Sequence, residues 1–342
     1  MRSFTMKSYE KVVGIDVSKE TLSISLYDGK SHISYETRNT VKSFFNDFVK
    51  KEKGIDFSKV LFMLENTGVY HLRLATHLSK ECGYIVSVAN PLVIKRYSQM
   101  NLKRVKTDKA DARLIAEYGY INGDDWLFSP RDIDYYKIDM KLKAVEDFHK
   151  QINMLSNQIE AIEYLPFKDN STLNAYKKLI ENFKKEIKKI EKELDILLRE
   201  KYVEEYKLLS SIPGVGLKLT GVILGKLNGF ANFDRGKDVT SFVGICPSIY
   251  QSGTSVNGRG KISKKGNGYM RTILYLCSLS ACKYNKSCAE LYERLVAKGK
   301  PKKVALIAVA NKLIRQAFGV LKSGKPYDPD HANNLTLVAK NA

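Results

Sequence analysis

Two short apolar runs in the first third of the chain each carry a carboxylate where a buried strand is expected. Residues 11–17 read KVVGIDV and include Asp16, and residues 60–64 read VLFML and are followed at once by Glu65. A carboxylate in such a place costs several kcal/mol unless it is paired or bound to a cation. The two runs therefore favour a fold in which two strand ends meet at a charge-compensated site.

The pattern around these runs predicts a mixed sheet with helices. Residues 21–27 and 31–37 alternate apolar and polar side chains, and Asp28-Gly29 between them is a strong turn signal. A fifth strand is expected at 84–89. Helices are expected at 40–52, with Thr40 as a candidate N-cap, and at 69–82, 91–99 and 107–121. This order, β-β-β-α-β-α-β-α-α, is that of a ribonuclease H-like α/β fold.

Two further carboxylates, Asp108 and Asp111, lie in the sequence TDKADARLIAEYG. Their i, i+3 spacing puts both on one face of a helix. On the expected fold, Asp16, Glu65, Asp108 and Asp111 would converge, and like charges that close call for a divalent cation, Mg²⁺ or Mn²⁺. Each residue alone has an ordinary interpretation, such as a strand-end turn residue or a first-turn acid behind the N-cap Thr107. The four together predict a metal site that acts on a phosphodiester.

The charge of the chain points to a polyanionic partner. Lys and Arg number 57 against 37 Asp and Glu, a net charge of 57 − 37 = +20. Nucleic acid fits this excess better than a membrane, because no window approaches 18 uncharged apolar residues and the N-terminus has no signal-peptide pattern. The five cysteines form no C-x-x-C pair, which favours a reducing cytoplasm, with the protein associated with the nucleoid.

Two basic segments are candidate nucleic-acid contacts, although a solvated basic surface is the alternative for both. The first surrounds the Asp pair and contains Lys103, Arg104, Lys106 and Lys109. The second lies in a stretch without acids, from Val239 to Ala289, and contains Arg259, Lys261, Lys264, Lys265 and Arg271. Its many glycines let the backbone approach a ligand closely. Ser252, Ser255 and Ser263 are candidate nucleophiles in this loop, and composition does not choose among them.

The middle of the chain is predicted to be helical, over 133–163 and again from about Ser171 to Tyr206. The apolar seam of the second run is Tyr176, Leu179, Phe183, Ile187, Ile190, Leu194 and Leu197. This near-heptad spacing predicts an antiparallel hairpin or coiled coil, which serves either an intramolecular bundle or dimerisation. Beyond it, IPGVG (Ile212–Gly216) resembles a helix-hairpin-helix turn whose glycines would leave backbone N–H groups free for a phosphate.

Several motifs occur in the order found in one known family. They are GIDVSKETL, MLENTGVY, NP-L-x-x-K-R-Y followed by K-T-D-K-A-D-A, IPGVG, F-V-G-I-C-P and S-G-T-S-V-x-G-R-G-K-I-S-K-K-G-N. With them the chain resembles, over about residues 11–320, the DEDD-type transposases of bacterial insertion sequences, which are related to the Piv-type invertases.

The resemblance implies an architecture and a set of site residues. It implies a RuvC-like catalytic domain at 8–125, a coiled-coil dimerisation segment at 133–206, a mainly helical transposase domain at 207–325 and a tail at 326–342. It also implies that Asp16, Glu65, Asp108 and Asp111 bind the metal. Ser252 is implied as the nucleophile that links covalently to DNA, with Ser255 kept as the fallback.

The resemblance further implies a recombinase that cleaves, exchanges and rejoins strands of double-stranded target and donor DNA. A structured noncoding bridge RNA would guide it, and a dimer or tetramer would combine domains of different protomers into one site. Two alternatives stay open. A junction resolvase would use the same four carboxylates with water as the nucleophile, and a non-catalytic nucleic-acid-binding protein would need none of them.

Overall fold

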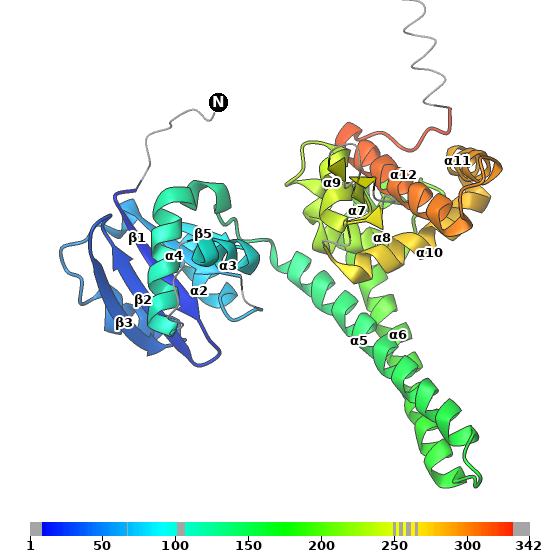
Figure 1. Cartoon of the computed structure of the whole chain (residues 1–342), viewed down its shortest axis with the longest axis horizontal. Helices are drawn as coiled ribbons and strands as arrows, with labels where there is room; N and C mark the ends of the chain where they lie inside the picture. Colours follow the sequence, from blue (N-terminus) through cyan, green and yellow to red (C-terminus); the bar gives the residue numbers. More distant parts are fainter. Residues whose placement is uncertain are drawn as a thin grey trace, which may run out of the picture. The chain divides into compact units, whose positions relative to one another are not determined.

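A computed structural model describes residues 9–66, 68–100, 107–248, 251–252, 256–257, 261–263 and 266–330. The chain separates into two compact units, Met1–Arg131 and Asp132–Ala342 (Figure 1).

The first unit is built on a five-stranded sheet in the order β3-β2-β1-β4-β5. The strands are β1 (Lys11–Val17), β2 (Thr21–Tyr27), β3 (His32–Arg38), β4 (Val60–Glu65) and β5 (Ile85–Ala89). β2 runs antiparallel to β1 and β3, whereas β4 runs parallel to β1 and β5. All five expected strands are present, in the expected order along the chain. The central strands β1 and β4 are nearly continuous apolar runs because both of their faces are covered, and the edge strand β3 carries exposed polar residues.

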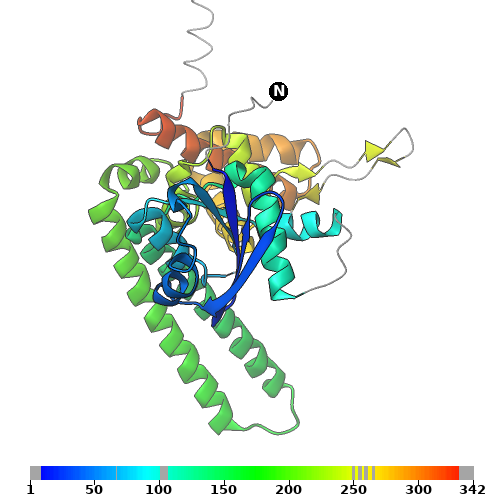
Figure 2. The same cartoon turned by 90° about the vertical axis from the view of Figure 1, so that its left-hand side faces the viewer.

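Helices cover both faces of this sheet, as Figure 2 shows with the strands between two helical layers. α1 (Val41–Phe44), η1 (Phe45–Val49), α2 (Leu72–Thr76) and η3 (His77–Glu81) pack on one face, and the short η2 (Phe57–Lys59) precedes β4. α3 (Pro91–Met100) and α4 (Asp108–Asn122) pack on the other face, followed by η4 (Gly123–Trp126). Both predicted N-caps form, since the hydroxyl of Thr40 accepts from Ser43 N and that of Thr107 from Ala110 N.

The second unit begins with a long helical hairpin, formed by α5 (Ile133–Glu163) and α6 (Asn170–Lys201). The hairpin confirms the two predicted helical runs, but α6 ends at Lys201 because Tyr202, with φ −126° and ψ 48°, leaves the helical region. The predicted seam is wrong at one position. Leu179 is 45% exposed, and Ile180 is buried in its place. Four of the five buried side chains of α6 therefore repeat every seven residues, as Leu173, Ile180, Ile187 and Leu194, and the fifth is Leu198.

The rest of the second unit packs around one apolar core. Its helices are α7 (Val203–Ser210), α8 (Leu217–Gly221), η5 (Val222–Lys226), η6 (Asn228–Phe230), α9 (Gly236–Val243), α10 (Gly268–Tyr284), α11 (Lys286–Ala297) and α12 (Lys302–Ser323). Four two-residue strands pair between α9 and α10: β6 (Pro247–Ser248) with β9 (Lys261–Ile262), and β7 (Gln251–Ser252) with β8 (Val256–Asn257). Within the described residues, α12 alone has the length and apolar composition to cross a membrane, and 44% of that window is buried in the protein.

Candidate active site

Asp16 and Glu65 lie side by side at the carboxyl ends of two neighbouring parallel strands. The pairing of β1 with β4 runs from Lys11 opposite Val60 to Ile15 opposite Leu64. One step further along the same register places Asp16 beside Glu65, on strands about 4.8 Å apart. Residues two apart on a strand share a face, so these carboxylates face the layer of α3 and α4.

α4 brings the other two carboxylates to this edge because its backbone lies directly against β1. A Cβ atom built on Gly14 would be 2.3 Å from Ala116 N and 2.4 Å from Ala112 O. Gly14 precedes Asp16 by two residues and shares its face, and Ala112 follows Asp111 directly. Sequence reasoning missed Gly14, although a glycine inside a buried strand is a recognised signal of close backbone approach.

The charges of the other three carboxylates act on Asp16. Burial, followed by the charges of Asp111, Glu65 and Asp108, raises the pKa of Asp16 from 3.8 to about 6. One contact opposes this shift, because the backbone N–H of Val17 donates to the Asp16 carboxylate. The structure therefore brings together all four acids that the sequence singled out, in an arrangement that repels itself without a counter-charge.

A divalent cation suits this set of donors. Carboxylate oxygens are the ligands preferred by Mg²⁺ and Mn²⁺, and a cation would offset the repulsion that raises the pKa of Asp16. Nevertheless, no three His, Cys, Asp or Glu side chains in the described part of the chain form a ready-made metal-binding group. The cluster is open, and its side chains would have to close around an ion.

The basic candidates are only partly placed. Lys109 is exposed in the first turn of α4, between the two aspartates. Arg271 is half-buried in α10, and its Nη1 donates to the carbonyl oxygen of Val243 at 3.1 Å, which ties it to the end of α9. Lys103, Arg104, Lys106, Arg259, Lys264 and Lys265 lie outside the described residues, and only the backbone of Lys261 is described.

The candidate nucleophile Ser252 lies in β7, where its backbone pairs with Val256 of β8. Nothing is described of its side chain, and Ser255 lies outside the described residues. Ser263 is half-buried, and its backbone N–H donates to the carbonyl oxygen of Cys246 at 3.1 Å.

The glycine turn after α7 packs onto α10. Gly214 has φ +99°, and a Cβ atom there would lie 2.7 Å from Ala281 Cβ. Gly216 begins the next helix, since its carbonyl oxygen accepts from Thr220 N at 3.0 Å, and a Cβ atom there would meet nothing within 4 Å.

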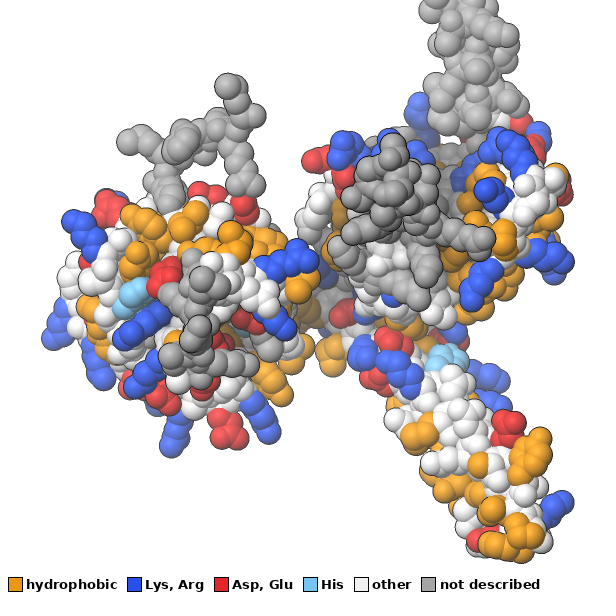
Figure 3. All heavy atoms as spheres, in the orientation of Figure 1, with side chains coloured by type: hydrophobic (Ala, Val, Ile, Leu, Met, Phe, Trp, Pro, Cys, Tyr) orange, Lys and Arg blue, Asp and Glu red, His pale blue; other side chains and the backbone are white. Residues whose placement is uncertain are grey.

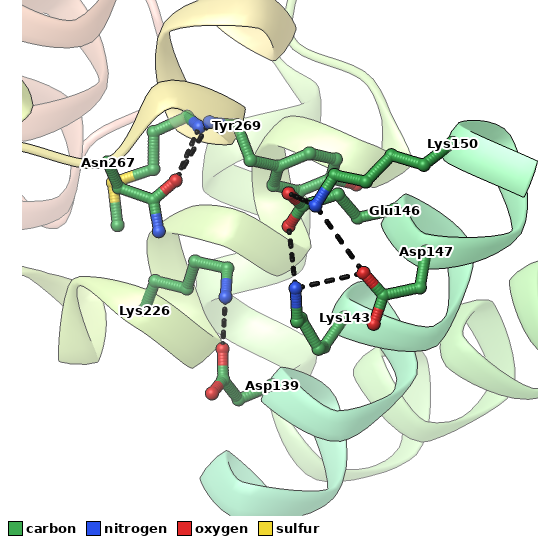
Figure 4. A network of polar contacts seen from close by, with 9 residues as sticks. Asp139, Lys143, Glu146, Asp147, Lys150, Lys226, Asn267 and Tyr269 are labelled. Atoms are coloured by element: carbon green, nitrogen blue, oxygen red, sulfur yellow. Dashed lines mark hydrogen bonds and ion pairs between the residues drawn. The ribbon is translucent and has the colours of Figure 1, made fainter. Parts of the chain in front are cut away.

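The exit from the basic loop is fixed against the base of the hairpin (Figure 4). Asn267 caps α10 by accepting from Tyr269 N at 2.8 Å. The Tyr269 hydroxyl is buried without a hydrogen-bond partner among the described residues. Burial, then the charges of Glu146 on α5 and Glu191 on α6, raises its pKa to about 12. The C-terminal end of this loop is thus packed against the hairpin.

Comparisons with known proteins identify relatives of this chain. A family model for DEDD-type IS110 transposases matches residues 13–162, and a model described as "Transposase IS116/IS110/IS902 family" matches residues 206–293. The pilin gene-inverting proteins of Moraxella bovis and Moraxella lacunata are each 26% identical, over 92% of this chain and 97% of theirs. The transposase for insertion sequence element IS1111A of Coxiella burnetii is 21% identical, over 88% of this chain and 87% of its own.

The two family models fall on different parts of the chain, and the first includes all four carboxylates. The inverting proteins align over almost their whole length, so the similarity is not confined to one unit. The chain belongs to the IS110-type transposases and is a DNA recombinase.

Proposed function

We propose that this recombinase cleaves and rejoins DNA through a covalent serine–DNA intermediate, next to a divalent metal held by Asp16, Glu65, Asp108 and Asp111. The observation that carries the proposal is the convergence of these carboxylates at one edge of the sheet, where burial and then the charges of the other three raise the pKa of Asp16. The strand order β3-β2-β1-β4-β5 supports an RNase H-like fold for the first unit.

The bound metal, Mg²⁺ or Mn²⁺, would supply a positive charge that polarises the scissile phosphate and stabilises the charge of its transition state. Asp16 and Glu65 would hold it from the sheet edge, and Asp108 and Asp111 from the first turn of α4. The open cluster leaves room for a phosphate oxygen beside the protein ligands.

Ser252 supplies the nucleophile in this proposal. Its Oγ loses a proton and forms a bond to phosphorus, while the bond from phosphorus to one DNA oxygen breaks and that oxygen takes up a proton. The reverse reaction with a hydroxyl group of another strand rejoins the DNA and frees the serine. No water is consumed, so strand exchange proceeds without net hydrolysis. Serine and carboxylates would come from different protomers.

The partners follow from charge and from the exposed surface. A net charge of +20 suits double-stranded target and donor DNA together with a structured guide RNA. The far end of the hairpin exposes apolar side chains, among them Tyr164 at 85% and Phe167 at 66% (Figure 3). We propose that this end binds a second copy, giving a dimer or a tetramer in the cytoplasm, at the nucleoid.

Trapping of denaturation-resistant protein–DNA adducts tests the mechanism. Wild type with Mg²⁺ and substrate DNA should form the adduct, whereas Ser252→Ala and Asp16→Ala should not. Ser255→Ala is the matched control and should retain it. Loss of the adduct in Ser255→Ala with retention in Ser252→Ala would transfer the nucleophile to Ser255.

The alternative of a junction resolvase makes a different prediction for the same variants. The carboxylate cluster alone is sufficient for attack by water, so Ser252→Ala would still cleave DNA, and no adduct would form in wild type. Cleavage products from Ser252→Ala would therefore reject the serine mechanism and retain the metal site.

A further inference from the structure

A long groove crosses the second unit along the outer face of α12. Its volume is about 1930 Å³. The inner face of α12 is buried in the core, and the opposite face, including Val304, Ala308 and Gly319, forms the floor. This floor is apolar and open, because Val304 is 52% exposed and a Cβ atom on Gly319 would meet nothing within 4 Å.

Unpaired cations line the same groove. Arg294 of α11, Lys303 and Arg315 of α12, and Lys325 are exposed, and none forms an ion pair with an acid in the described part of the chain. A fifth cation, Lys312, is already used, since its Nζ donates to the carbonyl oxygen of Ser287 at 2.7 Å. The groove thus combines an apolar floor with a rim that carries four exposed cations and one acid, Asp328.

The groove reaches the base of the segment that carries the proposed nucleophile. Pro247 of β6 and Ile262 of β9 line it, and these two residues are paired with each other. β7, with Ser252, follows β6 after two residues. A ligand in the groove would therefore lead towards the strand pair of Ser252.

We propose that this groove binds a single strand of DNA on its way to or from Ser252, an inference that rests on the proposed function. A duplex hides the faces of its bases, so it offers little to an apolar floor. A single strand exposes them, and its phosphates would meet the cations of the rim.

The test measures binding without chemistry, in a Ser252→Ala background with EDTA. The probes are a labelled oligodeoxythymidine and a labelled DNA duplex, titrated at several salt concentrations. The groove variant Arg294→Gln/Lys303→Gln/Arg315→Gln should weaken single-strand binding about tenfold or more. It should also reduce the slope of log binding constant against log salt concentration by about 2, because each of the three lost phosphate contacts contributes about 0.7. Duplex binding should change much less.

The matched control is Lys201→Gln/Lys237→Gln/Lys298→Gln, which removes the same charge from exposed cations of the second unit that do not line the groove. It should keep the full salt slope. Equal slopes for the groove and control variants would overturn the proposal, and so would equal losses on single strand and duplex.

A second pair of variants changes shape without changing charge. Gly319→Phe should fill the groove and weaken single-strand binding, while Gly319→Ala should not. If Gly319→Phe instead alters the oligomeric state and leaves DNA binding intact, the groove holds a second copy and the proposal is wrong. Failure of the serine mechanism would appear separately, as absence of the covalent adduct in wild type.

Discussion

Gly14→Ala should separate the two halves of the carboxylate cluster. The new Cβ would meet two backbone atoms of α4, Ala116 N at 2.3 Å and Ala112 O at 2.4 Å. Ordinary contacts begin at 3.4 Å, so the helix must move by about 3.4 − 2.3 = 1.1 Å. Neither atom belongs to a side chain that could rotate away. Overpacking of this kind costs about 1–3 kcal/mol, and contact with backbone puts the expected value near the upper end.

The same displacement should reduce activity, because α4 carries Asp108 and Asp111 while β1 carries Asp16. A misplacement of about 1 Å in a catalytic site costs about 100-fold in rate. We therefore expect Mg²⁺-dependent cleavage to fall about 100-fold in Gly14→Ala, with more Mg²⁺ needed for half-maximal activity. Thermal unfolding and cleavage against Mg²⁺ concentration measure the two effects.

Two other glycines provide a graded comparison. At Gly119 the nearest atoms to an added Cβ are side-chain atoms of Met63 and Val12, at 2.9–3.0 Å, so Gly119→Ala should have a smaller effect. At Gly54 nothing lies within 4 Å, so Gly54→Ala should be nearly neutral. If Gly14→Ala matches Gly54→Ala in both stability and activity, the close approach of α4 does not position the carboxylates.

Three further predictions concern stability. Asp16→Asn should stabilise the metal-free protein above pH 6, because a raised pKa in the folded state means that the ionised carboxylate destabilises that state. The rise of the Asp16 pKa to about 6 corresponds to about 3 kcal/mol of unfolding free energy. Solvent screening at this partly exposed group reduces the expected gain to about 1–2 kcal/mol. Denaturant titration should show that this gain in unfolding free energy disappears below about pH 4 and becomes smaller when Mg²⁺ is added. A gain that persists at low pH would contradict the prediction. Ile180→Ala should lower the free energy of unfolding by about 2 kcal/mol or more, whereas Leu179→Ala should lower it by less than about 0.5 kcal/mol. Equal losses of stability in thermal unfolding would show that Leu179 is packed in the seam as well. Gly214→Ala should clearly lower the melting temperature, because Gly214 has a positive φ and an added Cβ would meet Ala281. Gly216→Ala should not lower it, because Gly216 has open space around it. A larger drop in melting temperature for Gly216→Ala than for Gly214→Ala would refute the packing of this turn.

Local pattern determined a large part of this molecule. Alternation and apolar runs predicted all five strands of the first unit and their helices, since the types of residue in a short window set the element. The same patterns located Asp16 and Glu65 near strand ends and Asp108 and Asp111 on one helix face. The sequence also predicted the long hairpin.

Only the tertiary structure decided how these elements meet. Gly14 allows α4 to lie against β1. The sequence around Gly14 does not show which helix packs there, because α4 lies about a hundred residues further along the chain. Leu179 and Ile180 are equally apolar neighbours, and the packing of α5 against α6 decided which one is buried. Arg271 reads as a free cation in the sequence, yet the fold brings the Val243 carbonyl within its reach. Periodicity along the chain selects an element, whereas burial and pairing depend on surfaces that are distant in sequence.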